Sequence, residues 1–383
     1  MKVTFVSNYF NHHQKPLSDA LYRLTDGNYT FVSTTSMREE RKKLGYVPPR
    51  SIYELPAYKN DNLKNEALRL IAESDVVIAG SSDYSYIKDR IQDKKLMFKY
   101  GERPLRNGIE PLKYLPRVIK WNREYPGNAP IYLLASSAYA AWDYERFGMF
   151  KNKTYRWAYF TDTIHYDNID GLMAAKQKNS LLWVARFLEL KHPDHAVEAL
   201  RRLINNGIDC HLAFIGIGPI EQQIRRLVEE KGLGERISFL GAMSPEQVRS
   251  QMEKAEIFLF TSDKQEGWGA VVNEAMNSGC AVVGSHAAGS VPFLIKDGQN
   301  GMIYRSCDVD MLYNKIRYLL EHSAERDRMG REAYQTITGL WNADTAAERL
   351  LDLSRRLLEG DKAPALYGDG PCSKAKIIKD DWM

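Results

Sequence analysis

EIFLFTSDKQEGWGAVVNEAMNSGCAVVGS, residues 256–285, contains two short apolar runs with a glycine turn and a helical segment between them. The runs at 256–262 and 280–285 have the length and composition of buried strands. Glycines flank Trp268 in the turn, and two carboxylates, Glu266 and Glu274, lie eight positions apart around it. A strand, a helix and a second strand within about 30 residues predict a parallel βαβ unit.

The same alternation of strands and helices extends through the second half of the chain. Further strands are predicted at 180–187, 211–216 and 236–241, and helical spacing of apolar residues follows the first two. Ser244, Pro245 and Gln247 form a capping-box signature at the start of another helix. Strands alternating with helices in this way predict an α/β domain with a parallel sheet.

The first half repeats the pattern less regularly. Strands are predicted at 2–7, 29–34, 75–81, 96–102 and 131–137, with a helix at 62–74. The pattern breaks near residues 160–180, which we expect to act as a hinge between two domains. We therefore predict an N-terminal domain at 1–165, a second domain at 166–340, and a C-terminal helix and tail at 341–383 that packs back toward the N-terminal domain.

Composition favours a cytoplasmic globular protein. No signal peptide or membrane-spanning run is apparent, and the four cysteines have no paired or metal-ligand spacing. Residues 1–165 carry 26 Lys and Arg against 18 Asp and Glu. This basic half is compatible either with a solvated surface or with peripheral contact with an anionic membrane at its inner face. Nucleic acid is not expected as a partner, because no binding motif accompanies the scattered basic residues.

Three predicted strand ends in the second half carry unusual residues. Arg186 and Lys191 follow the run at 180–187, while Gly216 and Gly218 follow the next run and precede a helical segment. The EGWG turn follows a third strand. Because ligands of open α/β sheets bind at the carboxyl ends of strands, two cations beside glycine-lined helix N-termini predict a site for a diphosphate.

A family resemblance rests on these same segments. Residues 266–301 closely resemble the donor-site signature of the retaining GT-B glycosyltransferases of family 4 (glycosyl transferases group 1), in which two glutamates have E-x7-E spacing around an E-G-[FW]-G turn. The segment VARFLELKH (184–192) is similar to the family's G-R-L-x-x-x-K-G, and FIGIGP (214–219) resembles its G-x-G-P turn. The resemblance covers about residues 180–305, whereas the first half of the chain matches the family only in its alternation of strands and helices.

The resemblance implies a GT-B fold, in which two Rossmann-like doubly wound domains face each other across a cleft. It also implies that a sugar passes from a UDP- or GDP-sugar to a hydroxyl of a saccharide or lipid-linked acceptor, with retention of configuration and without a metal or other cofactor. By resemblance, the catalytic residues are Arg186 and Lys191, which would neutralise the leaving diphosphate, and Glu266, which would hold donor-sugar hydroxyls. Glu274 would hold the ribose, and the remaining donor-binding positions are Gly216, Gly218, Gly267, Trp268, Gly269 and Ala270.

Several alternatives stay open. A GT-B-like sugar-nucleotide epimerase shares the two-domain layout, and a non-catalytic nucleotide-sugar-binding partner of a transferase would need only part of the site. An NAD-dependent enzyme is disfavoured, since Glu221 stands where the dinucleotide fingerprint needs its third glycine. The roles of His12 and His13 stay open, and so do the sugar, the acceptor, the oligomeric state and the order of the 361–383 tail. The H-x-x-H spacing at 192–195 opens a helix and is not predicted to bind metal, and Asp308 or Asp310 is expected to cap the helix that follows.

Overall fold

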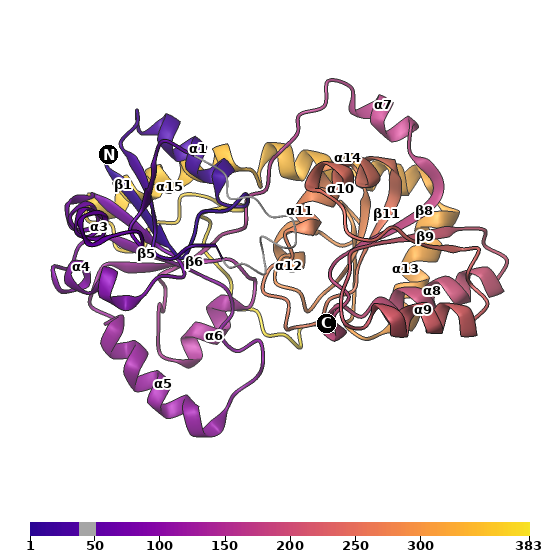
Figure 1. Cartoon of the computed structure of the whole chain (residues 1–383), viewed down its shortest axis with the longest axis horizontal. Helices are drawn as coiled ribbons and strands as arrows, with labels where there is room; N and C mark the ends of the chain where they lie inside the picture. The colour runs from indigo at the N-terminus through magenta and orange to yellow at the C-terminus, as the bar shows by residue number, and fades with distance from the viewer. Residues whose placement is uncertain (38–50) are drawn as a thin grey trace. The chain divides into compact units, whose positions relative to one another are not determined.

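The computed structural model describes residues 1–37 and 51–383, which form two compact units. The first unit comprises Met1–Asp162 and Trp341–Lys379, and the second comprises Thr163–Leu340 and the last four residues, Asp380–Met383. Each unit is built on one parallel sheet with helices on both faces (Figure 1). The expected class of two doubly wound α/β domains is confirmed.

The sheet of the first unit has seven strands in the order β3-β2-β1-β4-β5-β6-β7, all parallel. The five strands predicted from apolar runs are present, and β3 and β7 are additional strands of three residues each. The bounds are β1 (Val3–Ser7), β2 (Tyr29–Ser33), β3 (Glu54–Pro56), β4 (Val76–Ala79), β5 (Met97–Gly101), β6 (Ile131–Ala135) and β7 (Thr154–Arg156).

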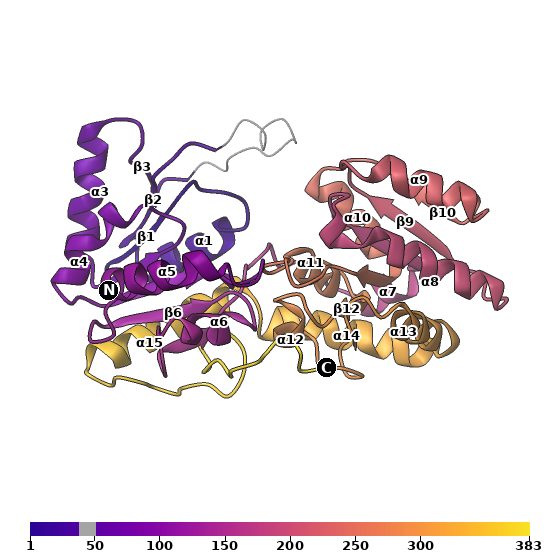
Figure 2. The same ribbon diagram turned by 90° about the horizontal axis from the view of Figure 1, so that it is seen from below.

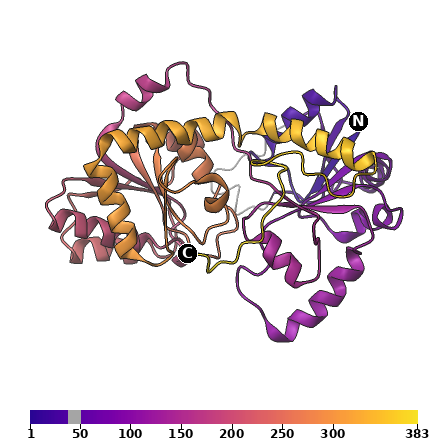
Figure 3. The ribbon, with the colours of Figure 1, turned by 180° about the vertical axis from the view of Figure 1, so that it is seen from behind.

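Helices cover this sheet on two sides. One face buries residues of α3, α4 and α6 against the strands, and the other carries α1 and α15, which pack against each other (Figure 3). The C-terminal helix α15 is therefore part of the first unit. The helical segments are α1 (Lys15–Leu24), α3 (Asp61–Glu73), η1 (Tyr84–Tyr86), α4 (Lys88–Gln92), α5 (Pro111–Glu124), α6 (Ala140–Arg146) and α15 (Ala343–Leu358).

The sheet of the second unit has six parallel strands in the order β10-β9-β8-β11-β12-β13. The strand predicted at 180–187 runs instead from Gln177 to Val184, because its polar start pairs with β11, and this places Arg186 in the following loop. The bounds are β8 (Gln177–Val184), β9 (His211–Ile215), β10 (Ile237–Phe239), β11 (Ala255–Phe260), β12 (Ala281–Ser285) and β13 (Met302–Tyr304).

The helices of the second unit form one layer on each face of its sheet. A core of large apolar residues lies between the strands and α8, α9 and α13, while α10, α11 and α14 pack together on the other face (Figure 2). The segments are α7 (Ile169–Ala174), η2 (Glu189–Lys191), α8 (Pro193–Asn205), α9 (Glu221–Glu230), α10 (Pro245–Lys254), α11 (Val271–Asn277), α12 (Val291–Leu294), α13 (Val309–Glu321) and α14 (Ser323–Gly339).

Local signals fix where several helices begin. The predicted capping box is present at α10, where the Ser244 side chain accepts from the Gln247 amide and the Gln247 side chain accepts from the Ser244 amide. Asp308 caps α13 by accepting from the Met311 amide at 2.8 Å, as predicted. Among the described residues, no helix has the length and apolarity needed to cross a bilayer.

Candidate functional site

The predicted donor-site residues lie in the second unit, along the carboxyl edge of its sheet. Strands β9, β8 and β11 are neighbours in the sheet and run parallel, so the loops that follow them emerge at the same edge. These loops carry Arg186 and Lys191, the Gly216–Gly218 turn, and the EGWG turn. Residues that are up to 88 positions apart in the chain are therefore collected at one edge, from Arg186 to Glu274.

The Lys191 ammonium forms an ion pair with the Glu266 carboxylate. Both side chains are only 15% exposed, so the pair is partly withdrawn from water. Two further bonds join the same loops, since the Thr261 hydroxyl donates to the Lys191 carbonyl at 2.5 Å and the Asp263 amide donates to the Leu190 carbonyl at 2.9 Å. The structure thus brings two of the three predicted catalytic residues into direct contact.

Arg186 differs from Lys191 in its surroundings. Its side chain is exposed, and within the described ranges it makes no ion pair or side-chain hydrogen bond. The loop that carries it is well fixed, because the Phe187 amide donates to the Ile217 carbonyl at 3.1 Å. An exposed guanidinium on an anchored loop is suited to bind an anion with two parallel hydrogen bonds.

Gly216 and Gly218 are required by close packing of two loops. Gly216 has φ +132°, and a Cβ there would lie 1.9 Å from the Ala185 carbonyl oxygen. A Cβ on Gly218 would lie 2.4 Å from the Phe187 carbonyl oxygen. The Gly216 amide donates to the Gly241 carbonyl at 2.8 Å, so it is engaged within the protein. The turn therefore holds the Arg186 loop in place, and any direct contact with a ligand falls to the residues after Gly216.

The EGWG turn combines a buried tryptophan with a glycine in a left-handed conformation. Trp268 is 1% exposed and its indole donates to the Asn273 amide oxygen at 2.9 Å, so this residue supports the turn from inside the unit. Gly269 has φ +89°, and a Cβ there would lie 2.2 Å from the Phe260 ring. Gly267 is buried, and Ala270 is the N-cap residue of α11.

Glu274 lies in the first turn of α11 and is half-buried. Its backbone carbonyl accepts from the Arg249 guanidinium at 3.0 Å and from the Ser278 hydroxyl at 2.9 Å. These bonds fix the helix that carries Glu274 through its backbone.

Sequence reasoning missed Asp263 and the partners of His192. The His192 Nε2 atom lies 3.2 Å from an Asp263 carboxylate oxygen, and His192 stacks on His195 with ring centroids 4.5 Å apart. The position of Asp263 just after β11, three residues before Glu266, is the one sequence signal that pointed to it. Neither histidine has a sequence signal beyond the H-x-x-H spacing.

In the first unit, the two histidines of uncertain role lie near a polar aromatic cluster. The rings of His12 and His13 are 3.9 Å apart, and the His13 ring is 6.3 Å from that of Tyr159. The Tyr159 hydroxyl donates to the Glu102 carboxylate at 2.8 Å, and burial raises the pKa of Tyr159 well above its ordinary value. This cluster stands at the carboxyl edge of the first sheet, where β1 and β5 end.

Comparisons with known proteins show which family of domains the second unit resembles. Residues 168–336 match the family model described as Glycosyl transferases group 1. Alpha-D-kanosaminyltransferase of Streptomyces kanamyceticus is 26% identical over 177 residues, which are 46% of this chain and 45% of that protein. The GDP-mannose-dependent alpha-(1-6)-phosphatidylinositol monomannoside mannosyltransferase of Mycobacterium tuberculosis (strain CDC 1551 / Oshkosh) is 24% identical over 196 residues, 49% of each chain.

The chain thus spans about half the length of the curated relatives it matches. A solved structure extends the likeness to the whole fold. The crystal structure of Anabaena Alr3699/HepE in complex with UDP is similar with a TM-score of 0.66 at 15% identity, covering 92% of this chain and 99% of that one. The second unit of this chain is therefore similar to Glycosyl transferases group 1 domains over residues 168–336, and the chain has the GT-B fold.

Proposed function

We propose that this protein is a retaining glycosyltransferase of family 4 that moves a hexosyl group from a nucleotide-sugar to a hydroxyl of a saccharide or lipid-linked acceptor. The observation that carries the proposal is the arrangement at the carboxyl edge of the second sheet. There Lys191 and Glu266 are in contact, and the exposed cation Arg186 lies on the same anchored segment after β8 as Lys191. The matched domain family and the nucleotide-sugar named for a relative support the same activity.

The chemistry of these side chains fits the departure of a nucleoside diphosphate. As the glycosidic C–O bond breaks, negative charge grows on the leaving oxygen, and Arg186 and Lys191 supply fixed positive charge for it. Removing one such cation is expected to raise the barrier by about 2–4 kcal/mol. Glu266 would accept hydrogen bonds from donor-sugar hydroxyls and Glu274 from ribose hydroxyls, since an ionised carboxylate only accepts. Glu266 acts in this proposal as an orienting group, with no proton transfer assigned to it.

The proposed transfer needs no cofactor and no divalent ion on the diphosphate. In the absence of metal, two basic side chains do the charge neutralisation that Mg²⁺ performs in other phosphate sites. Calorimetric titration with UDP or GDP should therefore give the same affinity with and without added Mg²⁺. Affinity that depends on Mg²⁺ would remove this part of the proposal.

The donor is tested with a panel of UDP-, GDP- and ADP-sugars, each assayed for consumption with and without candidate acceptors. Transfer to an acceptor with retained anomeric configuration, followed by NMR of the product, is the expected result. Consumption without any acceptor would favour an epimerase or a hydrolase, and binding without consumption would favour a non-catalytic partner.

Two variants separate the assigned roles. Arg186→Ala should mainly lower turnover, and Glu274→Ala should mainly weaken nucleotide binding. Arg226→Ala, which removes an exposed arginine from α9, serves as the charge-matched control and should change neither quantity. Unchanged turnover in Arg186→Ala would refute its role, and unchanged affinity in Glu274→Ala would refute the ribose contact.

We also propose that the first unit contacts an anionic membrane surface through α5. Tyr114, Val118 and Trp121 pack on the core, whereas Leu112, Leu115 and Ile119 are 93%, 64% and 63% exposed. The helix also carries four basic residues: Lys113, Arg117, Lys120 and Arg123. An apolar row flanked by cations is suited to lie in the interface of a bilayer that carries negative headgroups.

Vesicle co-sedimentation tests this contact. The protein should bind phosphatidylglycerol vesicles and not phosphatidylcholine vesicles, and the triple variant Leu112→Ser, Leu115→Ser and Ile119→Ser should lose most of the binding. Leu358→Ser, which removes a 50% exposed leucine from α15, is the control. Equal binding of the triple variant and the wild type would refute the assignment to α5.

A further inference from the structure

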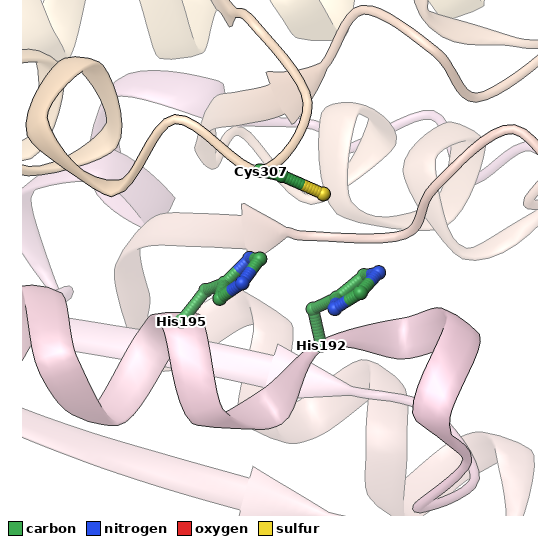
Figure 4. A group of neighbouring side chains, drawn as sticks. All are labelled: His192, His195 and Cys307. Atoms are coloured by element: carbon green, nitrogen blue, oxygen red, sulfur yellow. The ribbon is translucent and has the colours of Figure 1, made fainter.

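His192, His195 and Cys307 form a cluster that joins two segments far apart in the sequence. One possible ligand atom from each residue lies within 4.8 Å of the other two. His192 precedes α8 and His195 is in its first turn, whereas Cys307 lies in the loop after β13 with φ +65°. Figure 4 shows the Cys307 sulfur directed toward the space above the two imidazole rings.

The histidines are arranged so that each has a nitrogen lone pair available. The His192 Nε2 atom faces the Asp263 carboxylate at 3.2 Å, and in the tautomer that donates from Nε2 the Nδ1 atom keeps its lone pair for a metal ion. The His195 Nδ1 atom is buried without a hydrogen-bond partner among the described residues. The two rings are stacked at an interplanar angle of 7°, so one ring must turn out of the stack before both in-plane lone pairs can meet at a shared ion.

Cys307 is the exposed cysteine of the chain, whereas Cys210, Cys280 and Cys372 are buried. Its thiol is reachable by an ion from solvent.

We propose that His192, His195 and Cys307 bind a divalent transition-metal ion, with Zn²⁺ as the best match. Two imidazole nitrogens and one thiolate are a borderline-soft ligand set of the kind that Zn²⁺ takes, and water or the Asp194 carboxylate would complete the tetrahedron. Ligand atoms around tetrahedral zinc lie about 3.3–3.8 Å apart at the usual bond lengths, so the cluster closes by roughly 1 Å through side-chain rotation. The Cys307 thiol loses its proton to solvent on binding.

The site is placed to stabilise the loop that presents Lys191. His192 follows Lys191 directly, and the same segment is held to the Asp263 loop by the Leu190 carbonyl. A bound ion would add a tie from this segment to a different loop, the one after β13. The ion has no part in the proposed transfer, so metal binding can be tested independently of glycosyltransferase activity.

Titration of the untagged protein with Co²⁺ and with Zn²⁺ tests the proposal. We expect one ion per chain, a thiolate-to-cobalt charge-transfer band, and displacement of Co²⁺ by Zn²⁺. Cys307→Ser should abolish the band and weaken Zn²⁺ binding at least about tenfold, and His195→Asn should weaken it similarly. His211→Asn and His322→Asn, at histidines of the same unit outside the cluster, should bind as the wild type does.

Alkylation gives a second readout that does not depend on absorbance. Under native conditions iodoacetamide should modify Cys307, since the other three cysteines are buried. Zn²⁺ should slow this reaction in the wild type and in His211→Asn, and not in His195→Asn. Circular dichroism confirms that each variant is folded. No metal bound by the wild type, or equal binding by folded Cys307→Ser, would overturn the proposal.

Discussion

Replacing Glu266 by glutamine is expected to strengthen nucleoside diphosphate binding while it slows sugar transfer. Lys191 is held by the Glu266 carboxylate, so a diphosphate that uses Lys191 must compete with that ion pair. Exposed ion pairs contribute about 0.2–1 kcal/mol, and removing one partner of a fully buried pair costs about 3–5 kcal/mol. Side chains that are 15% exposed lie between these limits. A gain of about 1–2 kcal/mol corresponds to roughly 5–30-fold tighter binding.

The rate should change in the opposite direction. A hydrogen bond from a substrate hydroxyl to a charged group contributes about 1.5–3 kcal/mol, so transfer should slow by roughly 10–150-fold if Glu266 holds the donor sugar. Calorimetry with UDP and GDP gives the affinity, and initial rates with the active donor give the transfer step. The two measurements separate competition for Lys191 from contact with the sugar.

Two further variants test whether the Lys191–Glu266 ion pair limits the access of a diphosphate to Lys191. Glu189→Gln makes the same change of charge at an exposed position in the loop that carries Lys191, and it should leave the diphosphate affinity unchanged. In a Lys191→Met background the Glu266→Gln change should no longer strengthen binding, because the competing partner is gone. An equal gain in that background, or weaker binding of folded Glu266→Gln, would show that the pair does not control access to Lys191.

Three further predictions concern stability. Gly218→Ala should lower the free energy of unfolding by about 1–3 kcal/mol in urea denaturation, because its Cβ meets backbone at 2.4 Å, whereas Gly234→Ala, with open space, should not. Asp143→Ala should lower the free energy of unfolding by about 3–5 kcal/mol, because the buried Arg103 loses its ion pair with that carboxylate. A decrease below about 1 kcal/mol would contradict this. Burial lowers the pKa of Lys99 to about 8, so between about pH 8 and 10.4 the unfolded chain binds more protons than the folded one. The free energy of unfolding of the wild type should therefore rise across that window relative to that of Lys99→Met. A difference between the two proteins that stays constant with pH would refute this prediction.

Much of the fold could be predicted because its signals are local. Apolar runs of five or more residues identified the central strands, and Ser244 and Asp308 marked helix starts through their own side chains. The strands β3, β7 and β13 have three residues each and were missed, whereas β10, which is equally short, lies within the run predicted at 236–241. Whether such a short segment becomes a strand depends on the neighbouring strands with which it pairs, and the local sequence does not reveal these partners.

The site was predictable to a lesser degree. The strand-end rule placed Lys191 and Glu266 at one edge, but their direct contact joins residues 75 positions apart and depends on side-chain geometry. Gly216 was interpreted as an open backbone donor, whereas its amide is bonded to Gly241 and its missing Cβ makes room for a neighbouring loop. Cys307 has no sequence relation to His192, so only the fold brings them together.

The composition of the first unit from two separate stretches has a consequence for synthesis. Helix α1 packs against α15, and the Arg23 guanidinium donates to the Asp344 carboxylate at 2.6 Å. On the ribosome, Met1–Asp162 must therefore wait until the whole second unit and Trp341–Lys379 have been made, on the order of ten to forty seconds at ordinary elongation rates. During that interval the apolar side of α1 lacks its partner helix. A chaperone would therefore bind the nascent first unit at this stage of synthesis. The second unit, whose main body is one continuous stretch, can complete its sheet earlier.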